Sequence, residues 1–290
     1  MLASWIALSE RHWRFARAGL LRSDCTVFGV TSSFEQTNAA MAILRWVRGR
    51  APGTATLMGG GANCEAEMGR TMLDLAAGAV DLVFSGESEQ MFPVALRAVL
   101  AGKSIERRAI DGVLCNALDE IPRPEFHEYF GQLTAFLPAV SHDSSWLMYE
   151  TSRGCWWGQK HHCTFCGLDG ESMAFRQKSV AKVIDDIKHL FSTYRPKQVA
   201  MTDNIMPHSY HLSLLPQLAR SGLGGKIFYE QKSNLNVEQV KGLRDAGVCV
   251  IQPGIEDLST SLLRLMKKGV SASQNIALLR CCRACNIGLA

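Results

Sequence analysis

The chain has 290 residues, which favours about two domains at roughly 150 residues each. Hydrophobic residues make up 47% and charged residues 20%, so a disordered chain, a collagen-like repeat and a long coiled coil are excluded. The net charge of +4 does not indicate a nucleic-acid partner.

The amino-terminal segment, residues 1–21, is predicted to be a helical lead. Met1–Leu8 is apolar, but Glu10 and Arg11 follow it, whereas a secretory signal carries its charge before the apolar stretch. No uncharged apolar run approaches the ~18–20 residues that span a bilayer. We therefore expect a cytoplasmic protein with no membrane partner.

Residues 22–115 show the alternation of short apolar runs and amphipathic segments that is typical of a parallel α/β sheet. Strands are predicted over residues 25–30, 54–58 and 79–84, with helices over 35–50, 65–77 and from 87 to about 100. This pattern predicts a Rossmann-like, doubly wound domain. Ligands of such sheets bind at the carboxyl ends of the strands, here residues 31–38, 59–64 and 85–89.

Residues 116–144 contain three prolines and are predicted to form an irregular linker. Over residues 145–290 the alternation resumes, with strands predicted at 146–151, 198–201, 226–230 and 248–252. Ser179 and Asn236 are predicted helix N-caps, and further helices are expected over 258–268 and 273–285. A fifth strand is expected to begin at Leu289. Four βα units cannot close a barrel, so an open sheet or a partial barrel is expected.

Ten cysteines are many for a cytoplasmic chain, in which metal or redox chemistry is a better explanation than disulfides. Cys155, Cys163 and Cys166 lie on one loop after a predicted strand, separated by seven and two residues. Three thiolates can hold three irons of a cubane and leave the fourth iron open. Zinc is an alternative because His161 and His162 precede Cys163, and incidental buried cysteines are a third. The spacing alone leaves all three open.

A resemblance to a known family distinguishes among the cluster, the zinc site and the incidental cysteines. Residues 149–158 and 160–167 resemble the cluster loop of radical S-adenosylmethionine (SAM) enzymes. More narrowly, they resemble the cobalamin-dependent radical SAM proteins that mature ribosomally made peptide natural products (RiPPs). That subgroup has a longer first gap than the usual CxxxCxxC. The likeness covers most of the chain, including residues 28–36, 60–69, 86–89, 203–204, 228–234, 252–256 and 278–282.

The resemblance implies an α/β protein, with a Rossmann-like cobalamin-binding domain followed by a partial (β/α) radical SAM barrel. It implies a 4Fe–4S cluster, SAM and cobalamin as cofactors, with Cys155, Cys163 and Cys166 as metal ligands. It also implies SAM contacts from Asp203, Asn204, Lys232, Gln252 and Glu256. Cobalamin contacts are expected from Thr31, Ser32, Gln36, Gly59, Gly60, Gly61, Asn63 and Glu87.

Several of these residues could instead have a purely structural role. Asp203 could be a helix N-cap, and Lys232 a solvated surface lysine. Gln252 and Glu256 could belong to a strand-end turn, and the glycine triplet to an ordinary turn. Residues 1–100 lack a D-x-H-x-x-G stretch, so we expect no histidine ligand to cobalt there. The cysteines at 281, 282 and 285 are expected to be buried on an amphipathic helix rather than to bind metal.

The expected activity is methylation of an unactivated carbon in a precursor peptide, with a reductant such as ferredoxin or flavodoxin as a further partner and no nucleic acid. One alternative keeps the cofactors but changes the radical reaction to one without methyl transfer. A second is a truncated, inactive copy that only binds cobalamin or metal, since the sequence ends before further barrel strands. A zinc-bound structural protein is the third.

Overall fold

The computed structural model describes residues 10, 13, 25–59, 61–104, 106–140, 144–168, 173–222 and 226–290. The predicted helical lead, residues 1–21, lies outside the described residues except for Glu10 and Trp13. The chain divides into two compact units, Met1–Cys115 and Asn116–Ala290, which are described separately. None of the helices in the described ranges is long and apolar enough to cross a membrane.

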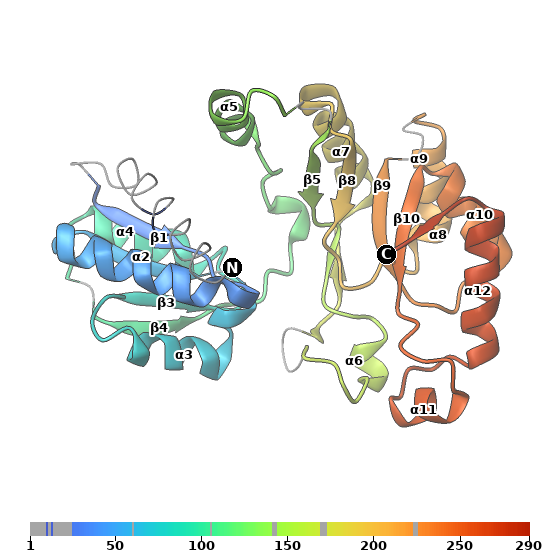
Figure 1. The fold of residues 1–290 in the computed structure, drawn as a ribbon, viewed down its shortest axis with the longest axis horizontal. Coiled ribbons are helices and arrows are strands. Elements are labelled where there is room, and N and C mark those ends of the chain that lie inside the picture. The colour runs from blue at the N-terminus through green and yellow to red at the C-terminus, as the bar shows by residue number, and fades with distance from the viewer. Residues whose placement is uncertain are drawn as a thin grey trace. The chain divides into compact units, whose positions relative to one another are not determined.

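Unit 1 contains a four-stranded parallel sheet in the order β1-β2-β3-β4 (Figure 1). Its strands are β1 (Val27–Val30), β2 (Ala55–Gly59), β3 (Leu82–Ser85) and β4 (Arg108–Asp111). Its helices are η1 (Phe34–Gln36), α2 (Thr37–Arg50), η2 (Ala62–Cys64), α3 (Ala66–Leu75) and α4 (Met91–Leu100). The first three strands and their helices confirm the predicted alternation. Strand β4 was not predicted, because only Ile110 of its four residues is buried.

Helices cover both faces of this sheet, as the Rossmann-like prediction requires. Helices α2 and α3 pack on one face around Leu44, Met58 and Val83. Helix α4 packs on the other face, against Phe84 and Ile110. Burial on both faces explains why these strands read as continuous apolar runs rather than as alternating ones.

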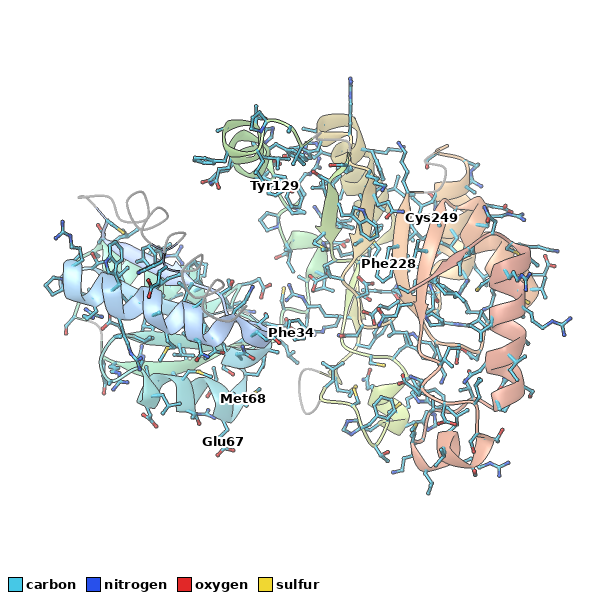
Figure 2. All side chains as sticks on the ribbon, viewed as in Figure 1. Phe34, Glu67, Met68, Tyr129, Phe228 and Cys249 are labelled. Atoms are coloured by element: carbon cyan, nitrogen blue, oxygen red, sulfur yellow. The ribbon has the colours of Figure 1, made fainter. Side chains whose placement is uncertain are left out.

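The loops that follow the strands of unit 1 carry exposed apolar side chains. Phe34, the first residue of η1, is 90% exposed, and Met68 in the first turn of α3 is 51% exposed (Figure 2). Phe34 also has a φ of +49°, which is unusual for a bulky residue. Such strained positions cluster at functional sites, which makes this rim of unit 1 a candidate for ligand contact.

Unit 2 contains a five-stranded parallel sheet in the order β11-β10-β9-β8-β5. Its strands are β5 (Trp146–Tyr149), β8 (Gln198–Met201), β9 (Ile227–Gln231), β10 (Val248–Pro253) and β11 (Gly288–Leu289). A small antiparallel pair, β6 (Ser152–Arg153) and β7 (Arg176–Gln177), lies beyond β5. The order confirms a partial barrel, and β11 confirms the strand expected near Leu289.

The helices of unit 2 cover one face of its sheet, over the buried side chains Tyr149, Val199, Ile227 and Ile251. They are α7 (Val180–Tyr194), α8 (Tyr210–Ser213), α9 (Leu215–Ala219), α10 (Val237–Asp245) and α12 (Ala272–Ala284). Two further helices, α6 (Gly158–His161) and α11 (Thr260–Leu265), lie beyond the ends of the strands (Figure 1). Of the three cysteines expected to be buried here, Cys282 on α12 and Cys285 at its C-cap are buried, whereas Cys281 is half-buried.

The predicted helix caps are present. Ser179 accepts a hydrogen bond from the Lys182 amide at 3.2 Å, and Asn236 accepts one from the Gln239 amide at 2.9 Å. Helices α8 and α9 were not predicted, and α12 begins one residue earlier than the predicted range, after its N-cap Ser271.

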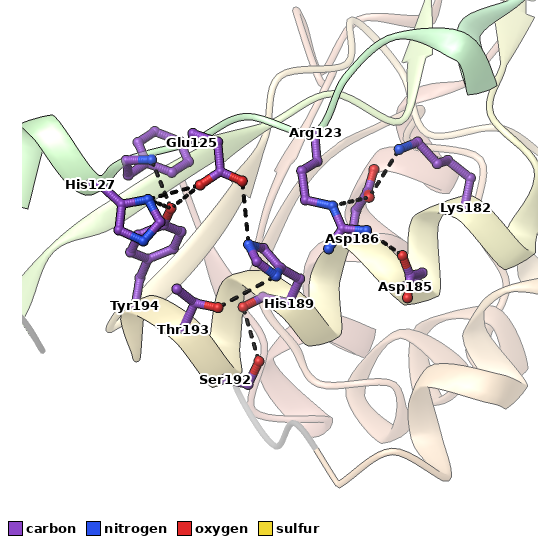
Figure 3. Close-up of polar contacts among 11 residues, drawn as sticks. Arg123, Glu125, His127, Lys182, Asp185, Asp186, His189, Ser192, Thr193 and Tyr194 are labelled. Atoms are coloured by element: carbon purple, nitrogen blue, oxygen red, sulfur yellow. Dashed lines mark hydrogen bonds and ion pairs between the residues drawn. The ribbon is translucent and has the colours of Figure 1, made fainter.

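The prediction of an irregular linker over residues 116–144 was wrong in part. This segment contains η3 (Leu118–Glu120) and α5 (His127–Phe136), and it clusters with unit 2. Phe130 of α5 stacks on Tyr194 of α7, with ring centroids 5.4 Å apart. The Tyr194 hydroxyl donates to Glu125 at 2.6 Å (Figure 3). These tertiary contacts anchor a helix whose own sequence signal is short and follows two prolines.

Candidate functional site

Two loops of unit 1 are joined by Asn63, which follows β2. Its side-chain amide donates to the Ser32 hydroxyl at 3.1 Å, the Phe34 carbonyl at 2.8 Å and the Thr37 hydroxyl at 2.8 Å. Ser32 is fully buried. Asn63 and Ser32, both predicted cobalamin contacts, therefore also build the rim on which Phe34 is presented.

Gly61 is required by the same close approach of loops. Its φ is +84°, and a Cβ there would overlap the Ser33 hydroxyl and the Ser32 carbonyl. The neighbouring Gly59 is less constrained, since its Cβ would lie 3.1 Å from that of Phe84. Gly60 lies outside the described residues.

The remaining predicted cobalamin residues occupy different positions. Thr31 and Gln36 are exposed, and the side-chain oxygen of Gln36 accepts a hydrogen bond from the Ser33 backbone amide at 2.9 Å. Glu87 accepts from the Cys115 amide at 2.7 Å, so it fixes the end of unit 1. The structure thus brings Ser32, Gly61 and Asn63 together and leaves Glu87 on the loop after β3.

In unit 2 the three predicted ligands lie on the loop that begins beyond β5. Cys163 is buried, whereas Cys155 and Cys166 are half-buried. The Cys155 sulfur accepts a hydrogen bond from the Gly158 amide at 3.2 Å, at the start of α6. Hydrogen bonds to cysteine sulfur are among the features that set the potential of an iron–sulfur centre.

Burial and nearby charged groups act together on the pKa of the Cys163 thiol. Burial raises this pKa, the ammonium groups of Lys268 and Lys232 oppose that rise, and Cys155 and Cys166 add to it. Both lysines and the two other thiols therefore lie within electrostatic range of Cys163. Among the described residues, no three His, Cys, Asp or Glu side chains are already arranged around a metal position.

The two histidines of the zinc alternative have other partners. The His161 ring stacks on Trp157 with centroids 4.1 Å apart, and the His162 Nε2 atom lies 2.9 Å from the Leu168 carbonyl. A zinc site would need their ring nitrogens as ligands. The Nε2 atom of His162 thus lies beside a backbone carbonyl, and three thiolates as the ligands of an iron–sulfur cluster stay a prediction.

A turn after α11, residues 265–269, forms a second wall along the cysteine loop. The Trp157 indole donates to the Lys267 carbonyl at 3.1 Å, and the Thr164 amide donates to the Met266 carbonyl at 3.1 Å. The Cys163 sulfur lies 3.9 Å from the Lys267 carbonyl oxygen. The backbone of this turn therefore fixes the loop on both sides of Cys163.

Asp203, predicted to face SAM, is fully buried at the end of β8. Its carboxylate accepts from the Thr151 amide at 2.7 Å, the Thr151 hydroxyl at 2.5 Å and the Ser152 hydroxyl at 2.6 Å. Burial raises its pKa to about 6, and these hydrogen bonds oppose the rise. Asp203 is not a helix N-cap. Its carboxylate ties the end of β8 to the start of the cysteine loop, and a direct SAM contact remains a prediction.

Lys232 is not a surface lysine. It is 5% exposed, and its ammonium lies 3.8 Å from the centroid of the Trp157 ring and donates to the Lys268 carbonyl. Burial first, and then the charge of Lys268, lowers its pKa to about 8. Glu256 pairs with Lys268 at 2.7 Å. Asn204 and Gln252 are exposed at the ends of β8 and β10, where their contacts with SAM stay predictions.

Three contributors to this site were not predicted: Lys268, Thr151 and the carbonyl groups of residues 265–268. Thr151 bridges Asp203 to the fully buried Tyr229, whose hydroxyl lies 2.9 Å away. The only local signal at the turn was Gly269 after two lysines, which indicates a turn but not its partner about 110 residues away.

The chain is similar in sequence and in fold to known proteins. No protein-family model matches the chain. An uncharacterized methyltransferase, PH0819 of Pyrococcus horikoshii, is 24% identical over 217 residues, which cover 68% of this chain and 45% of that protein.

Solved structures of the cobalamin-dependent SAM radical enzyme OxsB match the fold. The form with aqua-cobalamin bound and the form with aqua-cobalamin and SAM bound each give a TM-score of 0.71 at 19% identity, covering 94% of this chain and 41% of OxsB. The apo form gives 0.58 and covers 91% of this chain. The chain thus spans less than half the length of these proteins, and its fold is similar to that of OxsB, with a Rossmann-like unit followed by a partial (β/α) barrel.

Proposed function

We propose that the chain is the cofactor-binding part of a cobalamin-dependent radical SAM enzyme that methylates an unactivated carbon of a ribosomally made precursor peptide. The observation that carries the proposal is the loop of Cys155, Cys163 and Cys166, with Lys232 and Lys268 beside it. The similarity to a curated methyltransferase and to the OxsB fold supports the class. The peptide substrate is supported by the sequence resemblance.

When bound, the cofactors would supply an electron from the 4Fe–4S cluster, a radical precursor from SAM and a methyl group from cobalamin. The chain's own task is to hold them. Cys155, Cys163 and Cys166 would hold the cluster as thiolates. The Lys232 ammonium would pair with the carboxylate of SAM. The loops fixed by Asn63 and Gly61 would meet cobalamin at the rim of unit 1, and a ferredoxin or flavodoxin would be the reductant.

The first test is Cys163→Ala after anaerobic reconstitution with iron and sulfide. We expect wild type to hold about four irons and to release deoxyadenosine from SAM on reduction, and the variant to lose both. Cys281→Ala, a half-buried cysteine on α12, is the matched control and should keep both. Zinc in place of iron in wild type, or SAM cleavage by Cys163→Ala, would contradict the proposal.

The reaction is tested separately with candidate precursor peptides and added cobalamin. A mass gain of one methyl group per modified residue is expected. Any other mass change would overturn methylation while leaving the radical SAM assignment intact. Cobalamin that fails to bind wild-type protein would remove the first unit's proposed role.

A further inference from the structure

Lys268 contacts the second lysine of the site, Lys232, through its backbone and the cysteine loop through its side chain. Its ammonium pairs with Glu256 at 2.7 Å and lies 5.4 Å from the centroid of the Phe165 ring. Phe165 directly precedes Cys166. The side chain is only 13% exposed, so its charge is weakly screened by water.

The backbone of the same residue holds a second ammonium. The Lys268 carbonyl accepts the hydrogen bond from Lys232, whose Nζ atom lies 3.8 Å from the centroid of the Trp157 ring. Trp157 is two residues after Cys155. The two aromatic rings under the ammonium groups therefore belong to the two ends of the cysteine loop.

The arrangement brings together two positive charges and one carboxylate, Glu256, in a largely buried setting. The two ammonium groups repel each other, and Glu256 pairs with Lys268, so a further negative charge beside Lys232 would stabilise the arrangement. A cluster held by three thiolates has that sign. Its reduction adds one further negative charge, which a nearby positive charge stabilises.

We infer that Lys268 is a positioning residue, which holds its own ammonium group and that of Lys232 against the cysteine loop and thereby favours reduction of the cluster bound there. The inference rests on the proposed function. The inference concerns the reduction potential of the cluster, whereas the proposed function requires only that the cluster forms. Each can therefore be disproved without the other.

The test is an EPR-monitored potentiometric titration of the reconstituted holoprotein. Lys268→Gln removes the charge and its anchor at Glu256. We expect the equilibrium constant for reduction to fall about tenfold, the order for one weakly screened unit charge at an effective dielectric of ~20. Tenfold corresponds to about 59 mV for a one-electron couple.

Two variants separate this effect from general damage. Lys268→Arg keeps the charge and should stay within about twofold of wild type. Lys160→Gln removes the same charge from an exposed position on α6 and should also stay within about twofold, because water screens it. Loss of the cluster from Lys268→Gln with retention in Lys268→Arg would show that the charge acts on cluster formation and would overturn an effect on the potential.

An unchanged potential in Lys268→Gln would overturn the inference. So would an equal shift in Lys160→Gln, or loss of the cluster from both Lys268 variants. A wild-type protein without a reducible cluster would instead contradict the proposed function, and that result is visible before any variant is compared.

Discussion

At the scale of single residues, Asp203 shows how burial changes the meaning of a predicted ligand contact. The sequence places an aspartate at the carboxyl end of a strand, where barrel sites lie. The structure uses both of its oxygens to hold Thr151 and Ser152. The carboxylate therefore holds the residues at the start of the cysteine loop in place by hydrogen bonds. Because it is buried, its ionisation is unfavourable.

That cost predicts a pH dependence. Burial raises the pKa of Asp203 from 3.8 to about 6, so the folded state holds the proton more tightly than the unfolded state. The contribution of the protonated Asp203 carboxyl to the free energy of unfolding is complete below pH 3.8 and is lost as pH rises through about 6. From the difference between these pKa values, the loss approaches about 3 kcal/mol.

Comparison with Asp203→Asn isolates this contribution from that of Glu230, whose pKa burial also raises. The hydroxyls of Tyr149, Tyr210 and Tyr229 lie within electrostatic range of the same carboxylate but stay protonated over this range, since burial raises their pKa values. Urea unfolding between pH 4 and 7 should show wild type losing about 3 kcal/mol relative to the variant. Parallel pH profiles would contradict the assignment.

At the scale of elements, the turn over residues 265–269 decides the geometry beside the cysteines. The helical pattern predicted over 258–268 continues through the two lysines, but α11 ends at Leu265. Lys267 and Gly269 have φ values of +53° and +68°, so the chain turns back. Its carbonyl groups are then free of the helix and accept donors from Trp157 and Thr164. Tertiary contacts have overridden local helical periodicity.

Gly269→Ala tests this turn, because a Cβ there would overlap the Trp157 ring. Gly222→Ala is the matched control, since Gly222 has a similar φ of +70° and open space around it. Both variants share the backbone strain, so their difference reports the clash, about 1–3 kcal/mol. Thermal unfolding should place Gly269→Ala below Gly222→Ala, with reduced iron uptake. Equal stabilities would show that the turn tolerates displacement.

At the scale of the whole molecule, each unit has its own core, and the segment after Cys115 belongs to the second. Asp186 of α7 is fully buried and joins that segment to the sheet. It accepts a hydrogen bond from the Tyr149 hydroxyl at 2.9 Å. It also pairs with Lys182 at 3.1 Å and with Arg123 at 3.4 Å (Figure 3).

Asp186→Asn should therefore destabilise unit 2 alone. Removing one partner of a buried charge network costs about 3–5 kcal/mol. Asp185→Asn is the control, because Asp185 pairs with the same Arg123 at 2.5 Å but is 67% exposed, and such pairs contribute at most about 1 kcal/mol. Calorimetry should show one transition lowered by Asp186→Asn and the transition of unit 1 unchanged. Equal effects of both variants, or a shift in both transitions, would contradict separate cores.

Local sequence patterns were sufficient to predict much of the secondary structure of this molecule. Apolar runs and amphipathic segments predicted most strands and helices, and Ser179 and Asn236 are caps because capping depends on residues three positions apart. The cysteine spacing is equally local, so the sequence alone named the loop. Strand β4 and helix α5 escaped prediction because their burial comes from other elements.

The sequence by itself therefore determined the α/β order, the helix starts and the cysteine loop, because these depend on periodicity and short spacing. Only the tertiary structure decided what surrounds that loop. Asp203 meets Thr151 across 52 residues, and Trp157 meets Lys267 across 110. Contacts at such separations follow from the order of parallel strands in the sheet, which places the loops after β5, β8, β9 and β10 at the same edge, and no local pattern encodes them.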